Sequence, residues 1–202
     1  MKNSFDDAAA HWDDNPLHRE RVEAVARAIL DSVPLEPGMR GVEVGCGTGQ
    51  LGFTLLPQLD HLSFTDNSPA MLERVAEKGR EFPGKVSTLK LDISRDELPE
   101  KYALILALMT FHHMPGIEEN VARMITHLLP GGYFCLADLV EDDGHFHRHG
   151  DHKTVYNGFN PAYIAELFTA GGLQVLASTI PYRNRDPERS FRIFLVTGQL
   201  PA

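Results

Sequence analysis

The chain has 202 residues, of which 43% are hydrophobic and 23% are charged, and this length and mixture are typical of one compact globular domain. The formal net charge of −9 disfavours a nucleic-acid partner, because binding to a phosphate backbone draws on clustered Lys and Arg.

Two cysteines, Cys46 and Cys135, are too few for a disulfide framework, which favours a reducing compartment. The acidic first residues contain no apolar segment of the kind found in a secretory signal. No apolar run approaches the ~20 residues that span a bilayer. We therefore expect a cytoplasmic protein with no membrane partner, built as a single domain over residues 1–202. Whether the protein forms a homodimer is left open.

Helix start signals recur along the chain. Asn15-Pro16 predicts the start of the first helix, because Asn is a favoured N-cap residue and Pro suits the first helical position. Ser68-Pro69 and Asn160-Pro161 repeat this signal. The alternation of strands and helices predicts an α/β fold, with a parallel sheet covered by helices on both faces. The expected strands are 41–44, 62–65, 86–91, 104–109, 133–137, 173–180 and 191–197, the last two as a hairpin, and further helices are expected at 49–56 and 117–128.

A Gly-rich turn, Gly45-Cys46-Gly47-Thr48-Gly49, follows the first expected strand. Glycines there let the backbone approach a ligand closely. Asp66, 17 residues after Gly49, ends the second strand, where its carboxylate could accept hydrogen bonds from ribose hydroxyls. A dinucleotide fingerprint would need a third glycine at position 50, which is Gln50. The remaining alternative is a packing turn without a ligand.

The stretch V-E-V-G-C-G-T-G resembles motif I of the class I (Rossmann-like) S-adenosylmethionine (SAM)-dependent methyltransferases, in their small-molecule branch. Ala103 and Ala107 depart from the family pattern, where Asp and a small polar residue are usual. Further segments resemble family motifs in the same order over about residues 40–140: 64–72, 91–93, 102–115 with its F-H-H-M-P ending, and 128–132 with L-L-P-G-G. The resemblance implies a doubly wound, seven-stranded, mostly parallel sheet with an antiparallel C-terminal hairpin.

The resemblance also implies a cofactor, SAM, with S-adenosylhomocysteine (SAH) as its product. The Gly-rich turn would cradle the methionine end, Asp66 the ribose, and Asp92 and Ile93 the adenine, while Met109 would line the sulfonium side. The residues expected to bind the cofactor are Glu43, Gly45, Cys46, Gly47, Thr48, Gly49, Asp66, Asn67, Met71, Asp92, Ile93, Met109 and Trp12.

The resemblance to the family implies four regions along the chain. Residues 1–35 are expected to form an N-terminal lid or cap segment, in which Phe5, His11 and Trp12 could face the sulfonium charge. The alternative is an ordinary extension anchored by one tryptophan. The other regions are the SAM-binding core at 40–140, an acceptor-side loop at 141–159, and a C-terminal helix and hairpin at 160–202.

The catalytic residues stay open, and the candidates are His112, His113, Asp138 and His145. Methyl transfer needs a general base only if the acceptor must lose a proton. The histidine pair could instead shape the turn, and Asp138 could cap the loop that follows it. The loop is rich in histidine (His145, His147, His149, His152), a common metal ligand, but we expect it to contact the acceptor and expect no metal.

The sequence therefore predicts an enzyme that methylates a small molecule at O, N, S or C. The alternatives are a protein methyltransferase and a SAM-binding regulatory or carrier module without catalysis. The acceptor itself is left undetermined.

Overall fold

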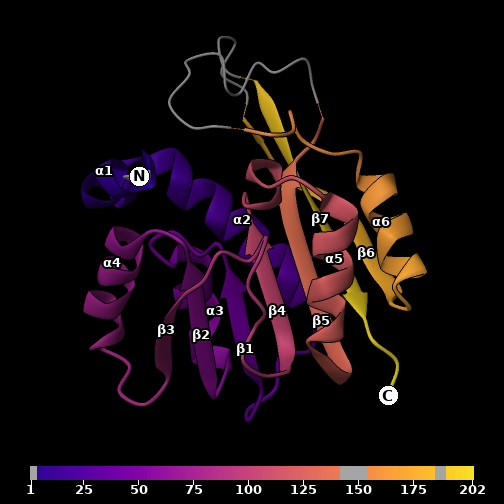
Figure 1. Ribbon diagram of the computed structural model, residues 1–202, viewed down its shortest axis with the longest axis horizontal. Helices are drawn as coiled ribbons and strands as arrows, with labels where there is room; N and C mark the ends of the chain where they lie inside the picture. Colours follow the sequence, from indigo (N-terminus) through magenta and orange to yellow (C-terminus); the bar gives the residue numbers. More distant parts are fainter. Residues whose placement is uncertain (1–3, 142–153, 185–189) are drawn as a thin grey trace.

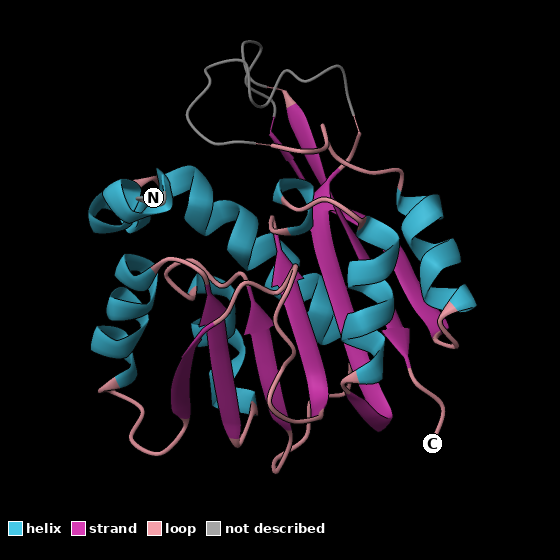
Figure 2. Cartoon of the chain, in the orientation of Figure 1, coloured by secondary structure: helices cyan, strands magenta, loops and turns pink. Residues whose placement is uncertain are grey.

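The computed structural model describes residues 4–141, 154–184 and 190–202. One seven-stranded sheet forms the centre, and helices cover both of its faces (Figures 1 and 2). The strands lie in the order β3-β2-β1-β4-β5-β7-β6. Their bounds are β1 Arg40–Val44, β2 His61–Asp66, β3 Val86–Lys90, β4 Tyr102–Leu108, β5 Leu128–Leu139, β6 Gln174–Asn184 and β7 Phe191–Gln199.

The first five strands are parallel, and β7 runs antiparallel to both β5 and β6. This arrangement confirms the predicted fold class. The strand order reverses between β1 and β4, and in open α/β sheets the crevice at such a reversal, outside the carboxyl ends of the strands, is the usual ligand site.

Helices start where the sequence predicts them. Asn15, Ser68 and Asn160 cap α2, α4 and α6, each accepting a hydrogen bond from a backbone N–H two or three residues further on. A proline follows each cap at the first helical position. The helices are α1 Ser4–Ala8, α2 Pro16–Ser32, α3 Gln50–Leu55, α4 Pro69–Gly79, α5 Ile117–Thr126 and α6 Pro161–Ala170, with short 3-10 helices η1 Ala9–Asp14, η2 Leu56–Gln58 and η3 Phe111–His113.

Side chains alternate between two cores. Leu104 and Leu106 of β4 face a cluster that includes residues of α2, α3 and α4. Ile105 and Ala107 of the same strand face a second cluster, which includes residues of α5 and α6. This alternation is the period of two expected of a strand buried on both faces. Within the described ranges, no helix is long and apolar enough to cross a membrane.

The structure differs from several predicted elements. The strand predicted at 173–180 continues to Asn184 as β6, and the helix predicted at 117–128 ends at Thr126 as α5. Strand β5 begins at Leu128, five residues before the predicted start, because Leu128 already pairs with Tyr102 and the strand continues through Gly131, whose φ is 77°. Strand β4 ends at Leu108, since Met109 takes a left-handed conformation with φ 57°. The segment before α2 folds into α1 and η1, which the sequence pattern did not predict as helices.

Candidate functional site

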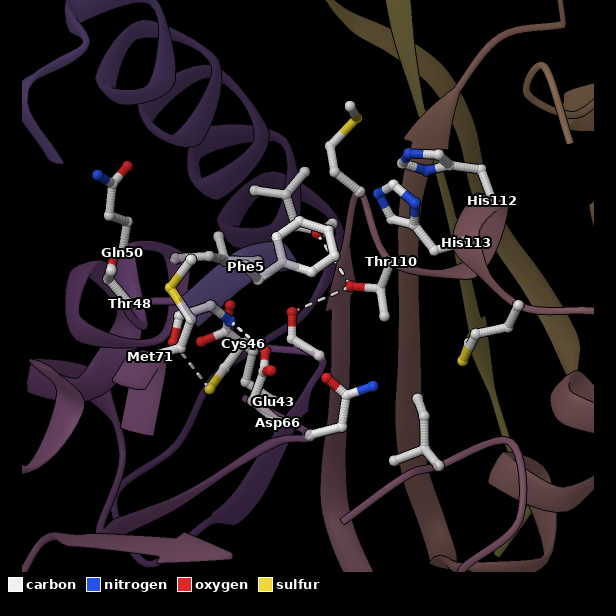
Figure 3. Close-up of a pocket in the computed structure, with 18 of the residues that line it drawn as sticks. Phe5, Glu43, Cys46, Thr48, Gln50, Asp66, Met71, Thr110, His112 and His113 are labelled. Atoms are coloured by element: carbon white, nitrogen blue, oxygen red, sulfur yellow. Dashed lines mark hydrogen bonds between the residues drawn. The ribbon is translucent and has the colours of Figure 1, made fainter. Parts of the chain in front are cut away.

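A cavity of about 470 Å³ lies at the carboxyl ends of β1, β2 and β4. Figure 1 shows the N-terminal segment lying across this end of the sheet. In Figure 3, Cys46 and Thr48 lie on one side of the cavity, His112 and His113 lie on the opposite side, and Phe5 lies between them. The cavity therefore combines residues from motif I, from the turn after β4 and from the N-terminus.

The Gly-rich turn depends on its glycines for two different reasons. A Cβ atom on Gly45 would lie 2.1 Å from Cγ2 of Thr110, so this position has no room for a side chain. A Cβ atom on Gly47 would meet only Nε1 of Trp12, at 3.9 Å, and Gly47 lines the cavity. Both residues have left-handed φ angles, 60° and 53°. The first glycine keeps the turn tight, and the second keeps the cavity open.

Glu43 lies beneath the turn, fully buried, and its Oε2 accepts a hydrogen bond from the backbone N–H of Gly52 at 2.9 Å. Burial raises the pKa of Glu43 to about 8, and the hydrogen bond from Gly52 offsets only part of that rise. A cationic ligand in the cavity would favour the ionised carboxylate.

Asp66 connects the end of β2 to the turn. Its Oδ2 accepts a hydrogen bond from the N–H of Gly47 at 2.8 Å, and its Oδ1 accepts one from the N–H of Ser68 at 2.8 Å. Burial raises the pKa of this carboxyl against the effect of these bonds. Each carboxylate oxygen can accept a further hydrogen bond, so Asp66 can still bind a hydroxyl in the cavity.

Every predicted cofactor residue except Gly49 lines the cavity. Gly49 instead caps α3 with φ 78°, and a Cβ atom there would lie 2.9 Å from the ring of Phe64. This glycine serves helix packing. Cys46 is buried, and burial raises the pKa of its thiol well above the ordinary value, so it is not an activated nucleophile.

The N-terminal segment is held down by what we call the Asp13 latch. Oδ1 of Asp13 accepts hydrogen bonds from Thr48 Oγ1 at 2.5 Å and Gln50 Nε2 at 2.6 Å, and Oδ2 pairs with Lys78 Nζ at 2.5 Å. Burial alone would raise the pKa of Asp13, but the bonds from these three residues outweigh it and lower the pKa. The latch brings Trp12 against the Gly-rich turn.

Two of the three aromatic residues predicted for this segment, Phe5 and Trp12, line the cavity. His11 does not, because its exposed ring lies 3.0 Å from the carboxylate of Asp14 on the surface. The ring of Phe5 lies 5.3 Å from that of His113.

His112 and Asp138 form a buried pair, exposed by 1% and 0%, in which Nδ1 of His112 lies 2.6 Å from Oδ1 of Asp138. The carboxylate also accepts hydrogen bonds from the backbone N–H groups of Phe111, His112 and Leu139. Burial alone would raise the pKa of Asp138, but the charge and hydrogen bond of His112 and these N–H groups lower it.

The catalytic candidates thus have different positions. His112 and His113 line the cavity, whereas Asp138 lies behind His112 and neither faces the cavity nor merely caps the following loop. His145 lies outside the described residues, as do His147, His149 and His152. Among the described residues, no group of three or more His, Cys, Asp or Glu side chains could hold a metal ion.

Sequence reasoning missed His18 and Arg21 of α2, which also line the cavity. Nδ1 of His18 lies 2.9 Å from the carbonyl oxygen of Trp12, so Nδ1 carries the proton. Burial and the charge of Arg21 lower the pKa of His18 to about 4. The sequence did contain a signal for these two residues. Positions 18 and 21 precede the apolar Val25 by seven and four residues, so all three side chains lie on the same face of the helix.

Doubly wound folds that bind adenosine cofactors, the class I SAM-dependent methyltransferases among them, have a Gly-rich turn after β1, an acid at the end of β2 and a ligand crevice at the strand-order reversal. Residues 42–134 match the family model described as "Methyltransferase domain". Residues 42–134 therefore carry a SAM-dependent methyltransferase domain, for which SAM is the cofactor and SAH the product.

Solved structures share the fold. A Haloferax volcanii methyltransferase, solved with the Trm112 methyltransferase activator, superposes with a TM-score of 0.79 over 100% of both chains at 20% identity. The N-methyltransferase NodS from Bradyrhizobium japonicum, solved with SAH, superposes with a TM-score of 0.73 over 94% of this chain and 90% of NodS, also at 20% identity.

Among curated proteins, the reducing polyketide synthase Preu2 from Preussia isomera is 31% identical over 112 residues, or 52% of this chain. The match spans only 5% of the length of that synthase.

Replacing Asp66 with alanine is expected to weaken SAM binding by about 1.5–3 kcal/mol, the scale of lost charge-assisted hydrogen bonds. Calorimetric titration with SAM and SAH measures the change. Asp60→Ala is the control, since Asp60 is exposed and precedes the opposite end of β2. Wild-type affinity in a folded Asp66→Ala protein would show that Asp66 does not bind the ribose.

Proposed function

We propose that the protein transfers the methyl group of SAM to a small organic molecule bound in the same cavity. The observation that carries this proposal is the buried His112–Asp138 pair, which lines the cavity through its histidine and lies opposite the Gly-rich turn. One cavity then holds both the cofactor residues and an oriented imidazole.

The residues present fit SAM. The carboxyl groups of Glu43 and Asp66 suit a cationic ligand that carries hydroxyls, and the space next to Gly47 is open. In this proposal Asp66 binds the ribose, Asp92 and Ile93 flank the adenine, and the Gly-rich turn holds the methionine end. SAM supplies an electrophilic methyl group when it is bound.

His112 is proposed as the general base for an acceptor whose reacting atom carries a proton. With the proton of Nδ1 directed at Asp138, Nε2 is the basic atom of the ring. The ionised Asp138 stabilises the imidazolium that forms when His112 takes a proton, as the carboxylate does in a catalytic triad. Asp138 is then a positioning residue, and His112 is the proposed general base, with its Nε2 buried at the cavity wall.

Residues 1–35 are proposed to act as a lid over the cavity. The Asp13 latch ties this segment to Thr48 and Gln50 of the turn and to Lys78 of α4. Phe5 and Trp12 bring apolar surface to the cavity, and excluding water strengthens the electrostatic interactions inside it. The similarity to a segment of a polyketide synthase supports a small organic acceptor over a protein or nucleic acid.

Two measurements test the function. Calorimetric titration should detect binding of SAM and SAH and none of NAD. Incubation with methyl-labelled SAM and a panel of phenols, amines, thiols, carboxylic acids and β-keto compounds should label at least one of them. NAD binding without SAM binding would contradict the proposal. Labelling of protein alone would favour a protein methyltransferase, and SAM binding with no labelled product would favour a regulatory or carrier module.

A further inference from the structure

The cavity wall opposite the Gly-rich turn is an arc of chain that spans residues 112–116. It runs from η3 to the N-cap of α5, and all of its members except Gly116 line the cavity. Figure 3 shows His112 and His113 on this wall. Connecting segments are more mobile than the elements they join, so the arc keeps one conformation only if contacts from elsewhere hold it.

Tyr156 holds both ends of the arc. Its backbone N–H donates a hydrogen bond to the carbonyl oxygen of His112 at 3.1 Å, and its hydroxyl accepts one from the N–H of Gly116 at 3.1 Å. The N–H of Val155 donates a second bond to the same carbonyl oxygen, at 2.9 Å. A carbonyl oxygen has two lone pairs, so these two donors satisfy that of His112. Tyr156 acts from outside the cavity, since it is not among the described residues that line it.

Tyr156 is in turn fixed to the end of β5. Its ring lies 5.1 Å from that of Phe159, which is buried. The N–H of Phe159 donates a hydrogen bond to the carbonyl oxygen of Leu139 at 2.8 Å. Gly158 permits this close approach, because a Cβ atom there would lie 2.7 Å from the same carbonyl oxygen. The arc is therefore tied to the strand end that carries Asp138.

We infer that Tyr156 is a positioning residue for methyl transfer, because it holds the arc that carries the proposed base. Asp138 fixes the ring of His112 through Nδ1, whereas Tyr156 fixes the backbone to which the ring is attached. General-base catalysis depends on the distance and direction of the base, so a displacement of the arc lowers the rate. This inference rests on the proposed function, in which His112 is the base.

The test removes one hydroxyl group. Tyr156→Phe keeps the ring beside Phe159 and loses the bond from Gly116. Tyr163→Phe is the matched control, because it removes a hydroxyl that donates to Glu118 at the exposed start of α5. In single-turnover assays with the acceptor found in the labelling panel, Tyr156→Phe should lower the rate about fivefold to tenfold, the scale of one hydrogen bond. Tyr163→Phe should keep the wild-type rate.

The His112→Ala background separates positioning of the base from a general effect on the fold. If Tyr156 acts through His112, Tyr156→Phe should slow the wild type and leave the rate of His112→Ala unchanged. SAH affinity should stay at the wild-type value in every variant, since the Gly-rich turn lies across the cavity. An equal loss of rate in both backgrounds, or no loss in the wild type, would overturn the inference.

A measurement without acceptor keeps the two proposals apart. In the SAH complex, NMR follows the proton on Nδ1 of His112, which is buried against Asp138. Exchange of a buried proton with water needs local opening, so it should be about fivefold to tenfold faster in Tyr156→Phe than in the wild type or Tyr163→Phe. Unchanged exchange would overturn the inference. A protein that methylates no small molecule but shows the faster exchange loses the proposed function and retains Tyr156 as the residue that places His112.

Discussion

Replacing Gly47 with valine is expected to remove measurable SAM binding, a loss above about 3 kcal/mol or more than a hundredfold. Gly47 has φ 53°, a conformation that a β-branched residue rarely adopts, and its Cβ would project into the cavity beneath Trp12. The valine side chain would therefore occupy space that the cofactor needs. Calorimetric titration with SAM and SAH measures the loss.

Gly84→Val is the matched control for backbone strain. Gly84 also has a left-handed φ, 79°, and a Cβ atom there would meet no atom within 4 Å. It does not line the cavity. Gly84→Val should lower the melting temperature by an amount similar to that of Gly47→Val and leave SAM affinity unchanged. If Gly47→Val binds SAM as the wild type does, the cofactor does not pass over the turn at this point.

The start signals of α2, α4 and α6 could be predicted from the sequence because each rests on a cap within three residues of the helix start. The motif I turn could also be predicted, since its glycines are consecutive in a short window. The different roles of these glycines could not. Whether a Cβ would meet Thr110, as at Gly45, or Phe64, as at Gly49, depends on residues distant in the chain.

The docking of the N-terminal segment could be anticipated only by resemblance. The two side chains that donate hydrogen bonds to Asp13, those of Thr48 and Gln50, lie 35 and 37 residues away in the chain. No local sequence pattern predicts such bonds. The helical periodicity places Arg21 on the apolar face of α2, but a charged residue at such a position is easily assigned to solvent. The pair of His112 and Asp138 joins η3, which follows β4, to the end of β5, 26 residues further on, and its prediction needs the register of β4 against β5.

Replacing His112 with alanine is expected to lower kcat by about 10²–10⁴, the range for removing a general base, for an acceptor whose reacting atom carries a proton. SAM affinity should change little, because Asp66 and the Gly-rich turn lie on the opposite side of the cavity. Single-turnover assays with the acceptor found in the labelling panel measure the rate. His127→Ala is the control, since this histidine contacts Glu97 and Glu100 away from the cavity.

Asp138→Asn separates positioning from simple burial. The amide cannot accept all the hydrogen bonds that the carboxylate now accepts, so both stability and kcat should fall. The pKa of Asp138 is lowered in the folded protein, so its contribution to stability is fully present above the ordinary carboxyl value of 3.8 and is lost as the pH falls below it. The stability difference between wild type and Asp138→Asn should therefore be constant above about pH 5 and shrink in acid.

A His112→Ala enzyme with wild-type kcat would mean that methyl transfer proceeds without this base, and that the buried pair serves only to hold the turn after β4.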